Sequence, residues 1–236
     1  MISKQIDRWI EWTKWPVATL ATLTVPITLV SMGRWLYASL ASPVYLVMFL
    51  AGLGLILFAS RTSFASSRVV RTLFRLLHDA TQVVVATLLF HPVVAIRRKT
   101  NTPDLSRVRW LGKGNWVLLA APYAFPLSTL LVWIPSVILF ASLRSAMLGF
   151  GLGLHWVYLV HHWRTGTSEL RRLGNLFCWM FLPAVNLVVA GVIFAFAIGG
   201  FSGVGNFLVD WFSLPWDTWS SIRSWLESPL PSPKAS

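Results

Sequence analysis

The sequence predicts an all-α integral membrane bundle of five to six helices with a small cytoplasmic β-hairpin. Hydrophobic residues make up 56% of the 236 residues and charged residues only 12%, and the mean hydropathy is +0.65. Soluble domains carry about 25% charged residues, so this composition excludes an ordinary soluble domain and a disordered chain. The apolar residues also form runs that approach the length of about 20 residues that a spanning helix needs.

The charge of the chain supports the same class. Lys and Arg total 20 against 8 Asp and Glu, which gives a net charge of +12. The basic residues stand in the gaps between apolar runs, as in cytoplasmic loops of membrane proteins, and the 14 Trp suit the two membrane interfaces. We therefore assign the charge to membrane topology and to attraction to the anionic lipid bilayer, and we expect no nucleic-acid partner. A multi-pass protein of a bacterial inner membrane is expected.

The first and last parts of the chain flank the expected core. Residues 1–16 place tryptophans and basic residues at helical spacing, which predicts an amphipathic helix at the interface. Residues 17–66 should hold two transmembrane helices, over Val17–Met32 and Pro43–Ser60. Residues 201–236 are rich in Trp among polar residues and should form an interfacial tail.

Residues 67–200 should form the membrane core. Val69–Phe90 is apolar but carries charged side chains, so it is either a span or a partly inserted helix. Asn115–Leu143 contains three prolines and should be kinked or broken. Met147–His162 and Leu176–Ile198 complete the expected spans.

A short β-region interrupts the core. Val93–Ile96 is β-branched, Asn101–Asp104 is a turn sequence, and Val108–Leu111 can return as a second strand. The stretch between Phe90 and Asn115 holds six basic residues and one acid, so we place this hairpin in the cytoplasm.

Ionisable side chains inside apolar helices are costly and are candidates for function. The run His78-Asp79-Ala80-Thr81-Gln82 is a degenerate form of HExxH, the helical motif in which two His ligate zinc and the Glu activates water. Asp79 replaces the Glu and Gln82 replaces the second His.

The neighbouring segments add a family resemblance. Gly114-Asn115-Trp116 followed by Pro122-Tyr123-Ala124-Phe125-Pro126 resembles the "GNW…APYFFP" segment of site-2-protease-like membrane zinc metallopeptidases. Thr167-Ser168-Glu169-Leu170 before Gly174 resembles their "QTDL…G" stretch, with Glu169 in place of an Asp. The resemblance covers roughly residues 67–200, and each motif departs from the family pattern.

The resemblance implies a zinc site with a catalytic base. The metal ligands would be His78, Gln82 and Glu169, with His155 as a substitute, and Asp79 would activate the water. Since an amide is a poor zinc ligand, we expect an eroded site in a weakly active or inactive enzyme that would cut a transmembrane segment. The alternative is a non-catalytic subunit or scaffold that binds a partner helix or a protein complex. A transporter ranks last, because polar groups are few and no repeat is visible.

Each of these residues also has a purely structural interpretation. His78 and Asp79 can hydrogen-bond each other or an Arg, and His155 can bond between helices. Glu169 can pair with nearby arginines at the surface, namely Arg164, Arg171 and Arg172. These alternatives stay open at the level of sequence.

Overall fold

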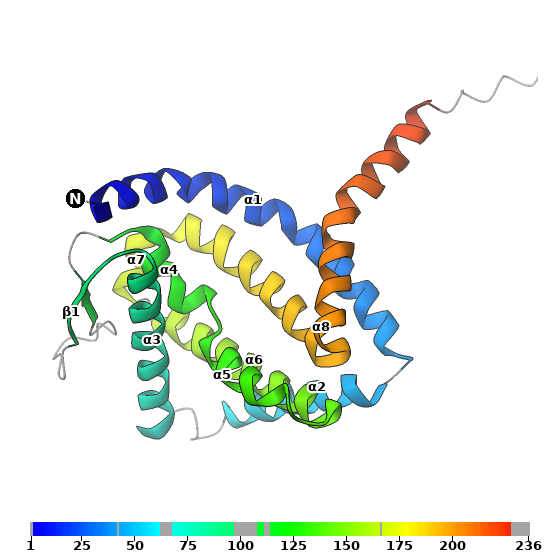
Figure 1. Ribbon diagram of the computed structural model, residues 1–236, viewed down its shortest axis with the longest axis horizontal. Coiled ribbons are helices and arrows are strands. Elements are labelled where there is room, and N and C mark those ends of the chain that lie inside the picture. The colour runs from blue at the N-terminus through cyan, green and yellow to red at the C-terminus, as the bar shows by residue number, and fades with distance from the viewer. Residues whose placement is uncertain are drawn as a thin grey trace, which may run out of the picture.

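The computed structural model describes residues 2–41, 43–61, 68–96, 108–110, 114–165 and 167–227. Within these ranges it contains eight α-helices and one two-stranded sheet (Figure 1). The helices are α1 (Ile2–Ser39), α2 (Pro43–Ala59), α3 (Arg68–Leu88), α4 (Trp116–Ala124), α5 (Leu127–Ser136), α6 (Ala141–Thr165), α7 (Ser168–Leu173) and α8 (Asn175–Glu227). The helical bundle agrees with the predicted class. The count exceeds the expected five to six because the proline-rich segment forms two helices and α7 was not expected.

Three helices among the described residues are long and apolar enough to cross a membrane, namely α1, α6 and α8. The α4–α5 pair meets the same criterion only if the two helices are taken as one bent span. This composition fits a membrane protein. α2 is apolar but has only 17 residues.

The first helix is longer than the sequence suggested. α1 joins the expected interfacial helix 1–16 and the expected span Val17–Met32 into one helix, although Pro16 and Pro26 lie inside it. Membrane helices tolerate proline because neighbouring groups satisfy the freed carbonyls.

The proline-rich segment is broken as predicted. α4 begins after Asn115, whose side chain accepts a hydrogen bond from the backbone N–H of Leu118 at 3.2 Å. It ends before Phe125 and Pro126, and α5 then leaves at an angle of 52° to α4. Tyr123, near the C-terminal end of α4, is fully buried and belongs to the site described below.

Glycines allow α2 and α6 to approach closely. A Cβ atom built on Gly52 would lie 1.9 Å from the carbonyl oxygen of Ala146, and one on Gly149 would lie 2.1 Å from that of Phe49. Only glycine fits at these two points, so the contact depends on backbone packing, as is common between membrane helices.

α8 changes direction at Gly200, which has φ 63° and ψ −147° and so breaks the helical path. The part after the break folds back beside α1, where the indole N–H of Trp211 donates to the hydroxyl of Thr28 at 2.8 Å. The expected interfacial tail is therefore helical as far as Glu227.

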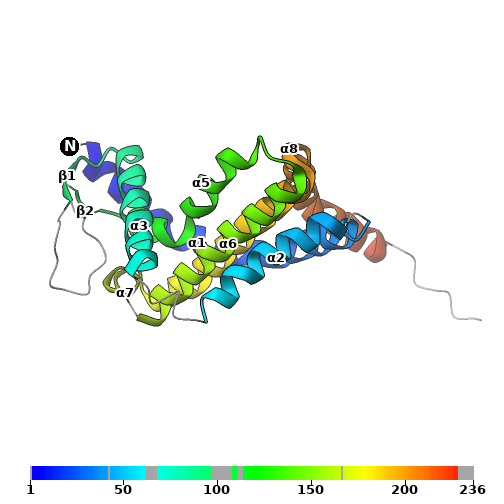
Figure 2. The same ribbon diagram turned by 90° about the horizontal axis from the view of Figure 1, so that it is seen from below.

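α3 does not run along the bundle. Figures 1 and 2 both show it crossing the end of the bundle at which α7, the hairpin and the N-terminus lie. α3 is amphipathic, with Val70, Phe74 and His78 buried and Arg71 and Arg75 exposed. It is not among the helices long and apolar enough to cross a membrane.

The predicted hairpin is confirmed in its two strands. β1 (Val93–Ile96) pairs antiparallel with β2 (Val108–Trp110), with Val93 opposite Trp110 and Ile96 opposite Val108. The predicted turn at Asn101–Asp104 lies outside the described residues.

Candidate functional site

The degenerate motif lies on the buried face of α3. His78 and Gln82 are four residues apart, so their side chains share one face of the helix. Both are fully buried, with exposed fractions of 1% and 0%. The helix thus places the two positions that would ligate zinc in an HExxH motif toward the same point.

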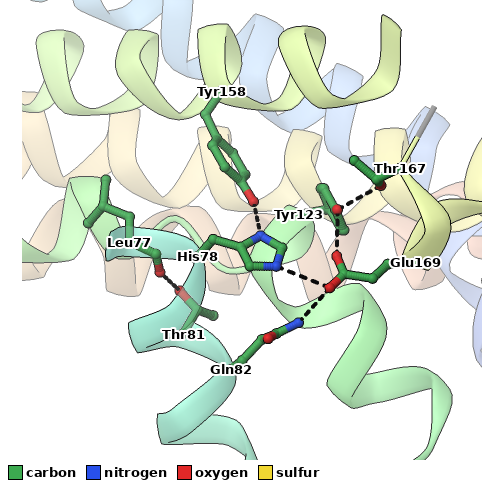
Figure 3. Close-up of polar contacts among 8 residues, drawn as sticks. All are labelled: Leu77, His78, Thr81, Gln82, Tyr123, Tyr158, Thr167 and Glu169. Carbon is green, nitrogen blue, oxygen red and sulfur yellow. Dashed lines mark hydrogen bonds and ion pairs between the residues drawn. The ribbon is translucent and has the colours of Figure 1, made fainter. Parts of the chain in front are cut away.

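Glu169, near the start of α7, forms hydrogen bonds with both of these side chains. Its Oε1 accepts from His78 Nε2 at 3.2 Å and from Gln82 Nε2 at 2.9 Å, while Oε2 accepts from the hydroxyl of Tyr123 at 2.8 Å (Figure 3). Glu169 is only 4% exposed. The structure therefore turns this side chain into the protein rather than toward the surface arginines. We call His78, Gln82, Glu169, Tyr123 and Tyr158 the polar cluster.

The sequence analysis did not identify two tyrosines of the polar cluster. The hydroxyl of Tyr158 on α6 lies 2.5 Å from His78 Nδ1, and that of Tyr123 on α4 also lies 2.9 Å from Thr167 Oγ1 (Figure 3). Helical spacing could have found Tyr158, because residues 155, 158 and 162 share one face of α6. Tyr123 lies inside the Pro122–Pro126 segment that carried the resemblance.

His155 does not join the polar cluster. Its Nε2 lies 2.8 Å from Oδ1 of Asn186 on α8, and the amide of Asn186 donates to the carbonyl oxygens of Tyr123 at 3.0 Å and Leu182 at 2.8 Å. His155 therefore bonds between helices, which was the structural alternative for this residue.

Asp79, the expected base, is 9% exposed on α3. Both ring nitrogens of its neighbour His78 bond to other groups, Nδ1 to Tyr158 and Nε2 to Glu169. The structure thus does not pair His78 with Asp79. Of the five residues proposed from sequence, it brings together His78, Gln82 and Glu169.

The electrostatics of Glu169 follow from these contacts. α7 lies outside the helices that could span a membrane. Burial alone would raise the pKa of Glu169. The hydrogen bond and charge of His78, together with the hydrogen bonds from Tyr123 and Gln82, hold the pKa below its ordinary value. The ionised carboxylate is therefore the form that this environment favours.

The polar cluster offers two of the usual zinc ligands, one imidazole and one carboxylate. A catalytic zinc centre uses three protein ligands and an open position for water. Here Gln82 directs its amide nitrogen at Glu169, and His155 bonds elsewhere. Among the described residues, no three His, Cys, Asp or Glu side chains are grouped so that they could hold a metal.

No known family model matches the chain, and no curated protein or solved structure matches it.

Proposed function

We propose that this is a non-catalytic membrane protein of site-2-protease-like organisation, in which the polar cluster is a hydrogen-bonded joint that stands in place of a zinc site. The observation that carries the proposal is the hydrogen bonding of Glu169, whose two oxygens accept three hydrogen bonds from protein groups. Hydrogen bonds to a charged group contribute about 1.5–3 kcal/mol each, so the cluster can hold its elements together without an ion.

The joint positions the basic hairpin. The polar cluster fixes α3 against α4, α6 and α7, and both strands of the hairpin contact α3. A second set of hydrogen bonds lies nearby. Oδ1 of Asp7 on α1 accepts from His91 Nε2 and from Asn115 Nδ2, both at 2.8 Å. We propose that the protein presents this hairpin at one end of the bundle to a cytoplasmic partner and acts as a binding subunit of a membrane complex.

Metal analysis tests the non-catalytic assignment. The purified protein should contain no more zinc than its His78→Ala variant, and a chelator should leave its thermal unfolding unchanged. Zinc in stoichiometric amount that is lost in His78→Ala, with a fall in unfolding temperature on chelation, would overturn the assignment.

Cross-linking tests the binding role. A photoreactive residue in place of Trp110, the last residue of β2, should capture one defined polypeptide in native membranes. Asp79→Ala should leave this product unchanged, and Glu169→Ala should reduce it because α3 loses its joint. A chain that yields no such product and remains a monomer would contradict the binding role.

The second candidate is a weakly active zinc peptidase. It is favoured by the 3.2 Å between His78 Nε2 and Glu169 Oε1, which is close to the ligand spacing of about 3.3 Å expected for tetrahedral zinc with bonds of about 2.0 Å. Cleavage of a transmembrane peptide that requires added zinc and is abolished in Asp79→Ala would establish this candidate in place of the first.

A further inference from the structure

An apolar pocket lies between α5, α6 and α8, and no residue of the polar cluster lines it. It has a volume of about 210 Å³, and its walls include Leu130 of α5, Leu148 of α6 and Val192 and Phe196 of α8. α6 and α8 are among the helices long and apolar enough to span a membrane. The pocket is smaller than the roughly 300–1,000 Å³ of typical small-molecule sites, so it suits a slender chain better than a ring system.

A basic side chain stands beside this pocket. Arg144 lies in the first turn of α6, four residues before Leu148, so the two side chains share one helix face about 6 Å apart along the axis. The guanidinium carbon of Arg144 lies 5.3 Å from the ring centroid of Phe196, which lines the pocket. The pocket therefore has a cation at its rim.

Arg144 lacks a counter-charge within the described part of the chain. None of the ion pairs formed there involves this residue, and its Nε is buried without a hydrogen-bond partner. An unpaired, partly buried cation is costly. The first turn of a helix also favours negative rather than positive charge, so an anion at this point would relieve both effects.

The position of Arg144 indicates where the anion comes from. It lies near the start of α6, about 20 Å along the helix from Tyr158 of the polar cluster. It is also next to the break of α8 at Gly200, where a Cβ atom built on this glycine would lie 3.7 and 3.9 Å from the two terminal guanidinium nitrogens. If α6 and α8 cross the bilayer, this end meets the lipid phosphates, and the pocket below lies at the depth of the acyl chains.

We propose that this site binds one glycerophospholipid. The lipid phosphate pairs with the guanidinium of Arg144, and one acyl chain enters the pocket along Leu148 and Phe196. The charge at the rim and the apolar pocket beneath it match the two parts of such a lipid. The site is independent of the polar cluster and of any partner at the hairpin.

Native mass spectrometry of the full chain in detergent, delipidated and then supplied with phosphatidylglycerol, tests the proposal. The wild type should retain one lipid, and Arg144→Gln should bind it at least about ten-fold more weakly, the loss expected for a charge-assisted hydrogen bond. Arg144→Lys should restore most of the binding. Val192→Trp, which fills the pocket, should weaken binding without changing the charge.

Matched controls separate the site from general lipid contact. Arg34→Gln removes an exposed arginine, and Ile138→Trp adds an indole where the side chain is 87% exposed. Both should bind phosphatidylglycerol like the wild type. Equal retention by wild type, Arg144→Gln and Val192→Trp, with the variants shown to be folded by circular dichroism, would overturn the proposal.

Two further probes identify the source of affinity. Diacylglycerol lacks the phosphate and glycerol 3-phosphate lacks the chains, so each should bind far more weakly than phosphatidylglycerol. A phosphatidylglycerol with a photoreactive acyl chain should label the pocket walls on α5 and α8. Tight binding of glycerol 3-phosphate alone would show an anion site without a chain. Labelling confined to other faces, or a polypeptide captured in the pocket, would also contradict the proposal.

Discussion

Glu169 is the residue on which the polar cluster depends, because it joins three helices through one carboxylate. It accepts from α3 through His78 and Gln82 and from α4 through Tyr123. A buried carboxylate is tolerated only when such partners satisfy it. The loss of any one of these hydrogen bonds should therefore destabilise the whole cluster.

The first prediction concerns pH. Because the folded-state pKa of Glu169 is lowered, its contribution to stability is fully present above the ordinary value of 4.5 and is lost as the pH falls through the folded-state value. We expect the free energy of unfolding, measured in detergent at decreasing pH from 7, to fall in the wild type. The fall should be smaller in Glu169→Gln. Glu11→Gln, at a side chain 52% exposed, should behave like the wild type. If Glu169→Gln loses as much stability at low pH as the wild type does, the result would count against the role of this carboxylate.

The second prediction concerns the tyrosine hydroxyl. Tyr123→Phe leaves one oxygen of Glu169 without its donor in a buried site, which should lower the free energy of unfolding by about 1–3 kcal/mol. Tyr37→Phe, at a residue 80% exposed, should change it little. Equilibrium unfolding measures both, and equal stabilities of the two variants would argue against the hydrogen bond to Tyr123.

Sequence reasoning found part of the site. The i, i+4 spacing of His78 and Gln82 and the resemblance around Glu169 were sufficient to place these three residues together. Asn186 was missed because a lone Asn in an apolar run has no spacing signal of its own. Tyr158 shares a helix face with His155 and His162, but this spacing does not show that the face meets His78. Their roles depend on which helices pack together, and one sequence does not show that.

At the scale of elements, the α2–α6 contact depends on glycine. Gly149→Ala would place its Cβ 2.1 Å from the carbonyl oxygen of Phe49 and force the helices apart, so we predict a loss of about 1–3 kcal/mol. Gly54→Ala on α2 meets no atom within 4 Å and should be neutral or stabilising by up to about 1 kcal/mol. Thermal unfolding compares the two, and similar shifts in both would contradict close packing.

The elements differ in how well sequence predicts them. Prolines and β-branched runs act locally, so the α4–α5 break and the two strands were predictable. The continuity of α1 through Pro16 and the turn of α8 at Gly200 depend on tertiary contacts. Trp211 with Thr28 is one such contact, between residues far apart in the sequence.

At the scale of the whole molecule, the ends of the bundle should face opposite sides of the membrane. With Cys178→Ser as background, Gln5→Cys at one end of α1 should react with an impermeant maleimide only after cells are opened. Leu40→Cys, just after the other end of α1, and Ile138→Cys, between α5 and α6, should react in intact cells. We base this expected orientation on the basic residues near the hairpin, which favour the cytoplasmic side. Identical labelling of all three would refute the arrangement.

We propose that protein groups alone hold the polar cluster together, without a metal. A double-mutant cycle of His78→Ala and Glu169→Ala, measured by unfolding in the presence of a chelator, tests it most directly. We predict a coupling free energy of about 1.5–3 kcal/mol that added zinc does not change. A coupling that is absent under chelation and appears only with zinc would contradict the claim.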